Sequence, residues 1–447
     1  MVPDGSLSRR QLLASGAGAG ALLSGGALAR RYLRTAAADA SPDADEPSAW
    51  PMAARDPGAT AYAPEADPPT DGVRVRWRCG IRSGPDPDQR PGPVVTDGIV
   101  YAVGPFGSSG VPGSPGLLAV SASDGEVLAH VRRPARTAPA VAPARAYRGR
   151  TVATLETPTF DPHRLVGFPS AGGESSDWFG GGEPRWTASV DADADSYSRT
   201  HFGGSTAPPP VAAGDTLVTY FRGTLAAVDG SSGTVRWTSD EGLPATRPAV
   251  RDGTAYVVGP EDGVRAYDLV TGDHATVRER FPESPMYLTA APDHLFVSGQ
   301  GWIRALDADG EVDWETTFED GGESVPAGPL AVGDGTVYAR RPAPSSVGGG
   351  EPEAEPTARV CALDAADGSV QWVAEAVAVA SGLFLPAAAD GLVAVPTADG
   401  ALAGLDTADG SVLWRFDPGA EPCSPAAIVG DAVYVVGNAH LYALEEP

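Results

Sequence analysis

Apolar and polar residues alternate along the chain in short runs separated by tight turns. One recurring unit is a Pro-led apolar run, an Asp-Gly or Gly-Asp pair and a second run rich in Val and Tyr, as in PVVTDGIVYAV, PAVRDGTAYVV and PLAVGDGTVYA. β-Branched and aromatic runs of this length, bounded by Gly and Asp, are typical of antiparallel strands joined by tight turns. Each unit therefore predicts one β-hairpin.

A second unit follows the hairpins and contains an acidic residue, a Gly-bearing gap and a Trp. It reads CALDAADGSVQW at Cys361–Trp372 and AGLDTADGSVLW at Ala403–Trp414. The gap predicts a turn with positive backbone dihedrals, and its leading Asp can accept N–H bonds from that turn. The Trp then lies on an outermost strand, where its ring covers the seam to the next unit. In this docking motif the acidic positions are Asp229, Asp268, Asp307, Asp364 and Asp406, and the Trp positions are Trp77, Trp237, Trp314, Trp372 and Trp414.

Together the two units predict four strands in about 40 residues, the period and strand count of a β-propeller blade. Seven blades are expected at residues 92–133, 137–190, 206–239, 245–280, 284–318, 325–376 and 382–416. Ser424–Glu445 supplies only three strands, and Val73–Cys79, with Trp77 in the docking position, is expected to add the fourth. This closure predicts an all-β ring of eight blades without an open seam. If the poorly matched second repeat is not a full blade, the ring has seven.

The docking motif resembles the repeats of the pyrroloquinoline-quinone-like (PQQ-like) β-propeller family, and the resemblance covers nearly the whole chain after Asp71. The preceding AWPMAARDPGATAY, with Trp50 and Asp56, resembles the segment before the first blade in the non-enzymatic, assembly-factor-like branch. The family also includes quinone- and calcium-dependent alcohol dehydrogenases, for which the resemblance implies two adjacent Cys, oxygen ligands for calcium and an Asp base. This chain has no adjacent Cys pair, so no catalytic residue carries over.

The composition of the chain excludes several classes of reaction and of ligand. The chain has 447 residues, a net charge of −26 and no lysine. Lysine-dependent chemistry, such as a Schiff base or a phosphate-loop lysine, is therefore excluded. The acidic balance also argues against nucleic acid, whose binding depends on cationic contacts to phosphate. A solvated acidic surface that stays soluble in brine, as in an extreme halophile, explains the charge, and a cationic partner is the alternative.

The N-terminal region predicts export. Residues 1–38 resemble a twin-arginine signal, because Arg9 and Arg10 precede an apolar run rich in Gly and Ala. An uncleaved anchor is the alternative for the same segment. Residues 39–70 are rich in Ala, Pro and Asp, which predicts a flexible linker, and the propeller is expected at 71–447.

Candidates for metal or nucleophilic chemistry are few. Three scattered cysteines lack the spacing of a zinc site, and none of the six His has a ligand-spaced partner. The run DADADS imitates the start of a calcium loop, but Ser196 occupies the position of the turn Gly, which favours a solvated acidic connector. The metal candidates are Asp191, Asp193 and Asp195, and the cysteines are Cys79, Cys361 and Cys423.

The longest segments between predicted strands fall chiefly on one face of the ring, where loops commonly carry function. They are Ile81–Pro91, Gly104–Gly116, Asp191–Ser205 and Arg341–Thr357. The sequence thus predicts an exported, monomeric, non-catalytic scaffold outside the cell or at its surface. It would bind a protein or surface ligand, hold no cofactor and touch a membrane only through an uncleaved anchor. The alternative is a PQQ- and calcium-dependent quinoprotein dehydrogenase.

Overall fold

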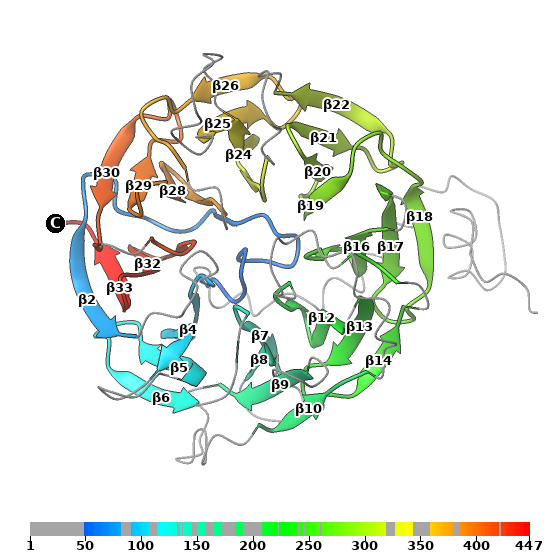
Figure 1. Ribbon diagram of the computed structural model, residues 1–447, viewed down its shortest axis with the longest axis horizontal. Coiled ribbons are helices and arrows are strands. Elements are labelled where there is room, and N and C mark those ends of the chain that lie inside the picture. Colours follow the sequence, from blue (N-terminus) through cyan, green and yellow to red (C-terminus); the bar gives the residue numbers. More distant parts are fainter. Residues whose placement is uncertain are drawn as a thin grey trace, which may run out of the picture.

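The computed structural model is a ring of eight β-sheets, each with four antiparallel strands (Figure 1). It describes residues 49–81, 91–106, 114–131, 135, 137–144, 150–156, 164–170, 184–190, 208–221, 223–239, 242–244, 246–259, 262–318, 327–342, 358–379, 385–419 and 422–447. Each sheet is one blade, so the predicted all-β propeller is confirmed with eight blades rather than seven. Within these ranges no helix has the length and apolar character needed to cross a membrane.

Blades are numbered in chain order, and their strands are given from the innermost to the outermost. Blade 1 contains β3 (Val94–Thr96), β4 (Ile99–Phe106), β5 (Ser114–Ser121) and β6 (Val127–Val131), and blade 2 contains β7 (Ala140–Pro143), β8 (Arg150–Glu156), β9 (Arg164–Pro169) and β10 (Trp186–Ala188). Blade 3 contains β11 (Val211–Ala213), β12 (Thr216–Phe221), β13 (Thr224–Asp229) and β14 (Val235–Thr238), and blade 4 contains β15 (Ala249–Arg251), β16 (Thr254–Val258), β17 (Val264–Asp268) and β18 (His274–Arg278).

The second half of the ring repeats this arrangement. Blade 5 contains β19 (Pro285–Ala290), β20 (Leu295–Gly299), β21 (Trp302–Leu306) and β22 (Val312–Thr317), and blade 6 contains β23 (Ala331–Gly333), β24 (Thr336–Pro342), β25 (Ala358–Asp364) and β26 (Val370–Val373). Blade 7 contains β27 (Ala387–Ala389), β28 (Leu392–Pro396), β29 (Leu402–Leu405) and β30 (Val412–Phe416), with the short β1 (Tyr62–Ala63) added inside β27. Blade 8 contains β31 (Ala427–Val429), β32 (Ala432–Gly437), β33 (His440–Glu445) and β2 (Arg74–Gly80).

Tight turns close the hairpins at one face of the ring. In blade 4 the turn between the first two strands has positive φ at both central residues, 50° at Asp252 and 74° at Gly253, as a two-residue hairpin requires. Antiparallel strands reverse direction at each connection, so the turns after the first and third strands share one face, the turn face. The other connections share the opposite, loop face. The long segments expected to meet a partner fall mostly at 82–90, 107–113, 191–207 and 343–357, outside the described residues.

Strand β2 closes the ring, as predicted. It pairs antiparallel with β33, and Trp77 lies opposite Ala443. At the turn face Arg74 Nη2 lies 2.8 Å from Glu445 Oε1, and Arg76 Nη2 lies 2.6 Å from Asp431 Oδ2. The outermost strand of the last blade therefore comes from the N-terminal side of the chain, which Figure 1 shows as the blue strand beside the red β33.

The structure corrects the expected flexible linker, residues 39–70, over its described part, residues 49–70. Residues 49–70, which we call the strap, run through the centre of the ring as the blue segment in Figure 1 and lead into β2. Trp50 and Met52 are 1% and 2% exposed, and Ala54 and Ala61 are fully buried. The innermost strand of every blade has an edge whose N–H groups need acceptors, and the strap offers backbone carbonyls at that edge. The ordered part therefore begins well before the expected start near Asp71.

Candidate functional site

The docking motif joins neighbouring blades through the indole N–H of its Trp. The Trp donors and their carbonyl acceptors are Trp77 with Ala122, Trp186 with Gly230, Trp237 with Leu269, Trp314 with Ala365, Trp372 with Thr407 and Trp414 with Pro69, at Nε1···O distances of 2.8 to 3.0 Å. In the second to fifth pairs the acceptor directly follows the acidic position of the next blade, and in the first pair it follows Ser121, which occupies that position in blade 1. In the sixth pair the acceptor belongs to the strap, just before β2. The first five bonds each tie one blade to the next, and the sixth ties blade 7 to the strap.

Small residues on both sides make room for these rings. Within a blade, the cross-strand partner of the Trp is Ala or Gly, as for Trp372 opposite Ala362. Across the seam, the ring lies over the turn Gly of the next blade, as for Trp237 over Gly272. Burying a ring of this size stabilises the fold by roughly 2–3 kcal/mol. The motif therefore holds neighbouring blades together.

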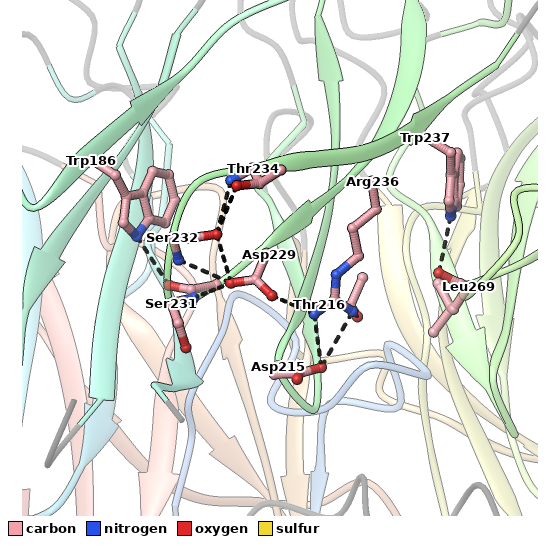
Figure 2. A network of polar contacts seen from close by, with 11 residues as sticks. Trp186, Asp215, Thr216, Asp229, Ser231, Ser232, Thr234, Arg236, Trp237 and Leu269 are labelled. Atoms are coloured by element: carbon pink, nitrogen blue, oxygen red, sulfur yellow. Dashed lines mark hydrogen bonds and ion pairs between the residues drawn. The ribbon is translucent and has the colours of Figure 1, made fainter. Parts of the chain in front are cut away.

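Figure 2 shows the motif where blades 2, 3 and 4 meet. The Asp229 carboxylate accepts the backbone N–H groups of Ser231 and Ser232 at 3.0 and 2.9 Å, which fixes the turn. Arg236 Nη2 lies 2.6 Å from Asp229 Oδ2, and Arg236 Nη1 donates to the Thr216 hydroxyl. Burial alone would raise the pKa of Asp229, but the bonds from Arg236 and Ser232 lower it below its usual value. The Asp229 carboxylate is therefore ionised and hydrogen-bonded within its own blade.

The other acidic positions of the motif hold their turns in the same way. Backbone N–H groups two residues further on donate to Asp268, Asp307, Asp364 and Asp406 at 2.7 to 2.8 Å. These carboxylates face the turn that they open, so none is directed into the centre of the ring.

Sequence reasoning missed Trp186 as a docking residue. It follows the third strand of its blade only after the insertion 171–183, so its spacing from the expected acidic position is lost. The remaining signal for a docking role was the small residue Gly167 in β9, which lies opposite Trp186. The other docking Trp residues also lie opposite Ala or Gly. Two outermost strands carry Ala opposite the small residue of the third strand, Ala129 in β6 and Ala275 in β18.

Gly272→Ala is expected to destabilise the ring more than Gly253→Ala, although both glycines have nearly the same φ, 76° and 74°. Either substitution places Ala in the left-handed region at a cost of about 1–2 kcal/mol. A Cβ at Gly253 has no heavy atom within 4 Å, whereas a Cβ at Gly272 would lie 2.7 Å from the Trp237 ring. Overpacking adds about 1–3 kcal/mol. Denaturant unfolding of the two variants checks this, and equal losses of stability would contradict the seam contact.

The centre of the ring is the place where all blades converge, and the strap runs through it (Figure 1). The strap follows the blades in chain order, and its carbonyls accept N–H groups from six innermost strands. The donor is the second residue of the strand, except in blade 5, where it is the last. The acceptor and donor pairs are Trp50 with Val95, Pro51 with Val141, Pro57 with Val250, Gly58 with Ala290, Thr60 with Val332 and Ala61 with Ala388, at N···O distances of 2.7 to 2.9 Å. The Asp67 N–H then donates to Gly430 of blade 8 at 2.9 Å.

Both ends of the strap point toward the turn face. β3 and β27 each run from the loop face to a tight turn, Asp97–Gly98 in the case of β3. Trp50 pairs antiparallel with Val95 of β3, whereas β1 pairs parallel with β27. The strap therefore enters the ring from the turn face, circles its inner edge and returns to the same face.

Asp56 is the polar centre of the strap. Its carboxylate accepts the Thr60 N–H at 3.1 Å and the Thr60 hydroxyl, and Arg55 Nη1 lies 3.8 Å from it. Arg247, from the connection between blades 3 and 4, reaches the Asp56 carbonyl oxygen at 3.5 Å. Burial lowers the pKa of Arg55, and it lowers the pKa of Arg247 to about 10, while the Asp56 charge opposes both shifts. The charged groups at the centre thus face the strap itself.

Among the residues that the structure describes, the other candidates for chemistry do not come together in a site. Within the described ranges, no three His, Cys, Asp or Glu side chains form a group that could hold a metal ion. The three cysteines are buried free thiols, and burial raises the pKa of Cys361 to about 12, which keeps it protonated at neutral pH. Two sets of predicted residues lie outside the described ranges, the metal candidates Asp191, Asp193 and Asp195 and the export residues Arg9 and Arg10.

Comparison with known proteins gives one family match and several structural ones. The family model described as outer membrane protein assembly factor BamB matches residues 178–284 and 299–446, more than half of the chain. No curated protein matches the sequence.

Several solved structures share the fold. Quinohemoprotein alcohol dehydrogenase from Comamonas testosteroni has a TM-score of 0.59 and 15% identity, over 93% of this chain and 82% of that chain. A europium-containing methanol dehydrogenase has a TM-score of 0.60 and 12% identity, over 90% and 98%. BamB from Moraxella catarrhalis has a TM-score of 0.49 and 15% identity, over 83% and 99%. At these identities the first two structures establish the propeller fold alone.

Proposed function

Because the chain belongs to the family described as outer membrane protein assembly factor BamB, we propose that it is a non-catalytic propeller scaffold that binds a protein or cell-surface ligand. It acts as an exported monomer, outside the cell or at its surface. The export route through Arg9 and Arg10 and the monomeric state are parts of this proposal, which cell fractionation and light scattering can test.

The observation that carries the proposal is the strap in the ring centre. A small molecule held by a propeller is best enclosed where the blades converge, because only there do many groups surround it. Here six inner-strand amides of that region donate to the chain itself, and Trp50 and Met52 are buried beside them. Binding of a partner is then left to the outer surfaces, where the long segments of the loop face occur in the sequence.

The alternative, a PQQ- and calcium-dependent dehydrogenase, would need a ring centre that is open to the cofactor and lined with groups that bind it. A quinone with several carboxylates needs cationic partners, and calcium needs clustered oxygen ligands. The guanidinium groups of Arg55 and Arg247 each contact Asp56 through a terminal nitrogen while their Nε atoms have no hydrogen-bond partner, and the inner amides donate to the strap. The residues present therefore do not fit the cofactor, and no reaction step through it is derived.

Titration with pyrroloquinoline quinone and calcium tests the proposal. The purified protein is expected to show no saturable quinone binding in the micromolar range and no dye-linked oxidation of alcohols. The physical reason is that quinone entry requires the strap to give up at least part of its six backbone hydrogen bonds. Stoichiometric binding with turnover would reverse the assignment in favour of the dehydrogenase.

A further inference from the structure

The strap contacts the inner edges of the blades mainly through its backbone, although residues 52–58 form turns and bends and only β1 is a strand. Six of its backbone carbonyls accept N–H groups of innermost strands, with Pro, Gly, Thr and Ala among the acceptor residues, and the Trp50 N–H donates to Val95. In such edge binding, main-chain hydrogen bonds supply the affinity, and a few side-chain pockets supply the specificity. The pockets here belong to the two most deeply buried large side chains of the strap, Trp50 and Met52. The ring centre thus recognises a backbone trace with a small number of anchors.

The strap is held in a strained conformation. Arg55, Ala59 and Ala61 have φ values of 66°, 63° and 50°, in the left-handed region that favours glycine. Ala59 and Ala61 have no polar side-chain atom that could form a compensating local bond. Strain in a bound segment opposes binding, so the strap is attached less firmly than its six bonds alone suggest.

The strap nevertheless fits closely where Gly58 approaches blade 5. A Cβ at Gly58 would lie 2.5 Å from the carbonyl oxygen of Ala290, in the innermost strand of blade 5. Backbone cannot move aside as a side-chain tip can, so only Gly is accepted there. The site therefore discriminates between closely similar peptides.

We propose that the ring centre is a receptor site for a polypeptide segment that adopts the conformation of residues 50–61, and that these residues are its own, exchangeable occupant. The same segment of a second copy, or a free peptide of that sequence, can take its place. The centre is separate from the loop face, where the scaffold's partner is proposed to bind. The occupant is joined to β2 through Asp71 and Gly72, so covalent linkage keeps its effective concentration high and excludes competitors in the intact chain.

The experiment opens that linkage after folding. A specific protease site is inserted between Asp71 and Gly72 of the full chain, the folded protein is cut, and a fluorescent synthetic peptide of residues 49–66 is added. We expect saturable uptake by the cut protein and none by the uncut protein, with the β-sheet circular dichroism of the ring unchanged. Compared with the parent peptide, an Ala61→Gly peptide should bind about tenfold more tightly because it relieves the strain, and a Gly58→Ala peptide at least about tenfold more weakly.

Three outcomes would overturn the proposal. The first is a cut protein that takes up no peptide. The second is loss of the ring's circular dichroism as the cut strap departs, because the strap would then be an integral part of the core. The third is equal binding of all three peptides, which would indicate uptake without recognition by the inner strands.

Discussion

Deletion of Arg74–Gly80 is expected to abolish the cooperative unfolding of the ring. This segment is β2, and its loss leaves β33 with an unpaired edge and opens the seam between blades 8 and 1. It also removes Trp77, whose indole N–H donates to Ala122 of blade 1 at 2.9 Å. Truncation of a buried Trp alone costs about 3–5 kcal/mol, and the whole stability of a domain is about 5–15 kcal/mol. Loss of the Trp77 side chain together with the whole β2–β33 pairing therefore removes a large part of that stability and leaves the seam open.

Thermal unfolding followed by circular dichroism in molar salt checks this expectation. High salt is chosen because a chain with a net charge of −26 repels itself when screening is weak. A chain lacking residues 1–48 is the control for removal of N-terminal sequence, and its transition should match that of the full chain. A sharp, unshifted transition in the β2 deletion would show that the ring does not depend on its closing strand.

The double variant Trp50→Ala, Met52→Ala is expected to release the strap from blades 1 and 2 while the ring stays closed. Both side chains are almost fully buried, and truncations of this kind remove about 3–5 and 2–5 kcal/mol. The amides of Val95 and Val141 donate to the strap beside these anchors. Their hydrogen exchange should become faster by a factor on the order of 10³, which corresponds to about 4 kcal/mol of local opening.

Exchange measured by mass spectrometry over the inner strands provides the readout. The amide of Leu363 is the internal control, because it lies in the third strand of blade 6, which pairs on both sides within its own blade. Its exchange should be unchanged in the double variant. Equal acceleration at Leu363 would indicate general loosening of the ring, and unchanged exchange at Val95 and Val141 would show that the strap is not anchored by these side chains.

The architecture could be predicted from the sequence because the same types of side chain recur at fixed spacing in successive blades. The closing strand was identified because Trp77 stands in the docking position of a stretch with no strand partners before it, and β2 indeed pairs with β33. The docking geometry follows from local chemistry, since an Asp at the start of a turn and a Gly with positive φ serve the same purpose in blades 3 to 7.

The strap could not be predicted, because it binds through its backbone. Its Ala, Pro and Asp content is that of a flexible tether, and carbonyl acceptors leave no pattern of apolar and polar side chains. Trp50 and Met52 were the available signal, since a Trp in a solvated linker has no partner to bury it. The resemblance of the same stretch to the segment before a first blade pointed in that direction, but composition suggested a linker that ran up to Asp71.

Hydrogen exchange of the intact protein, with and without pyrroloquinoline quinone and calcium, tests the filled ring centre most directly. The amides to compare are those of Val95, Val141, Val250, Ala290, Val332 and Ala388, all of which donate to the strap. A filled centre predicts slow exchange at all six positions and no change when quinone and calcium are added. Fast exchange in the protein alone that slows at these positions on addition of the quinone would contradict the account, because it would reveal an open centre that accepts the cofactor.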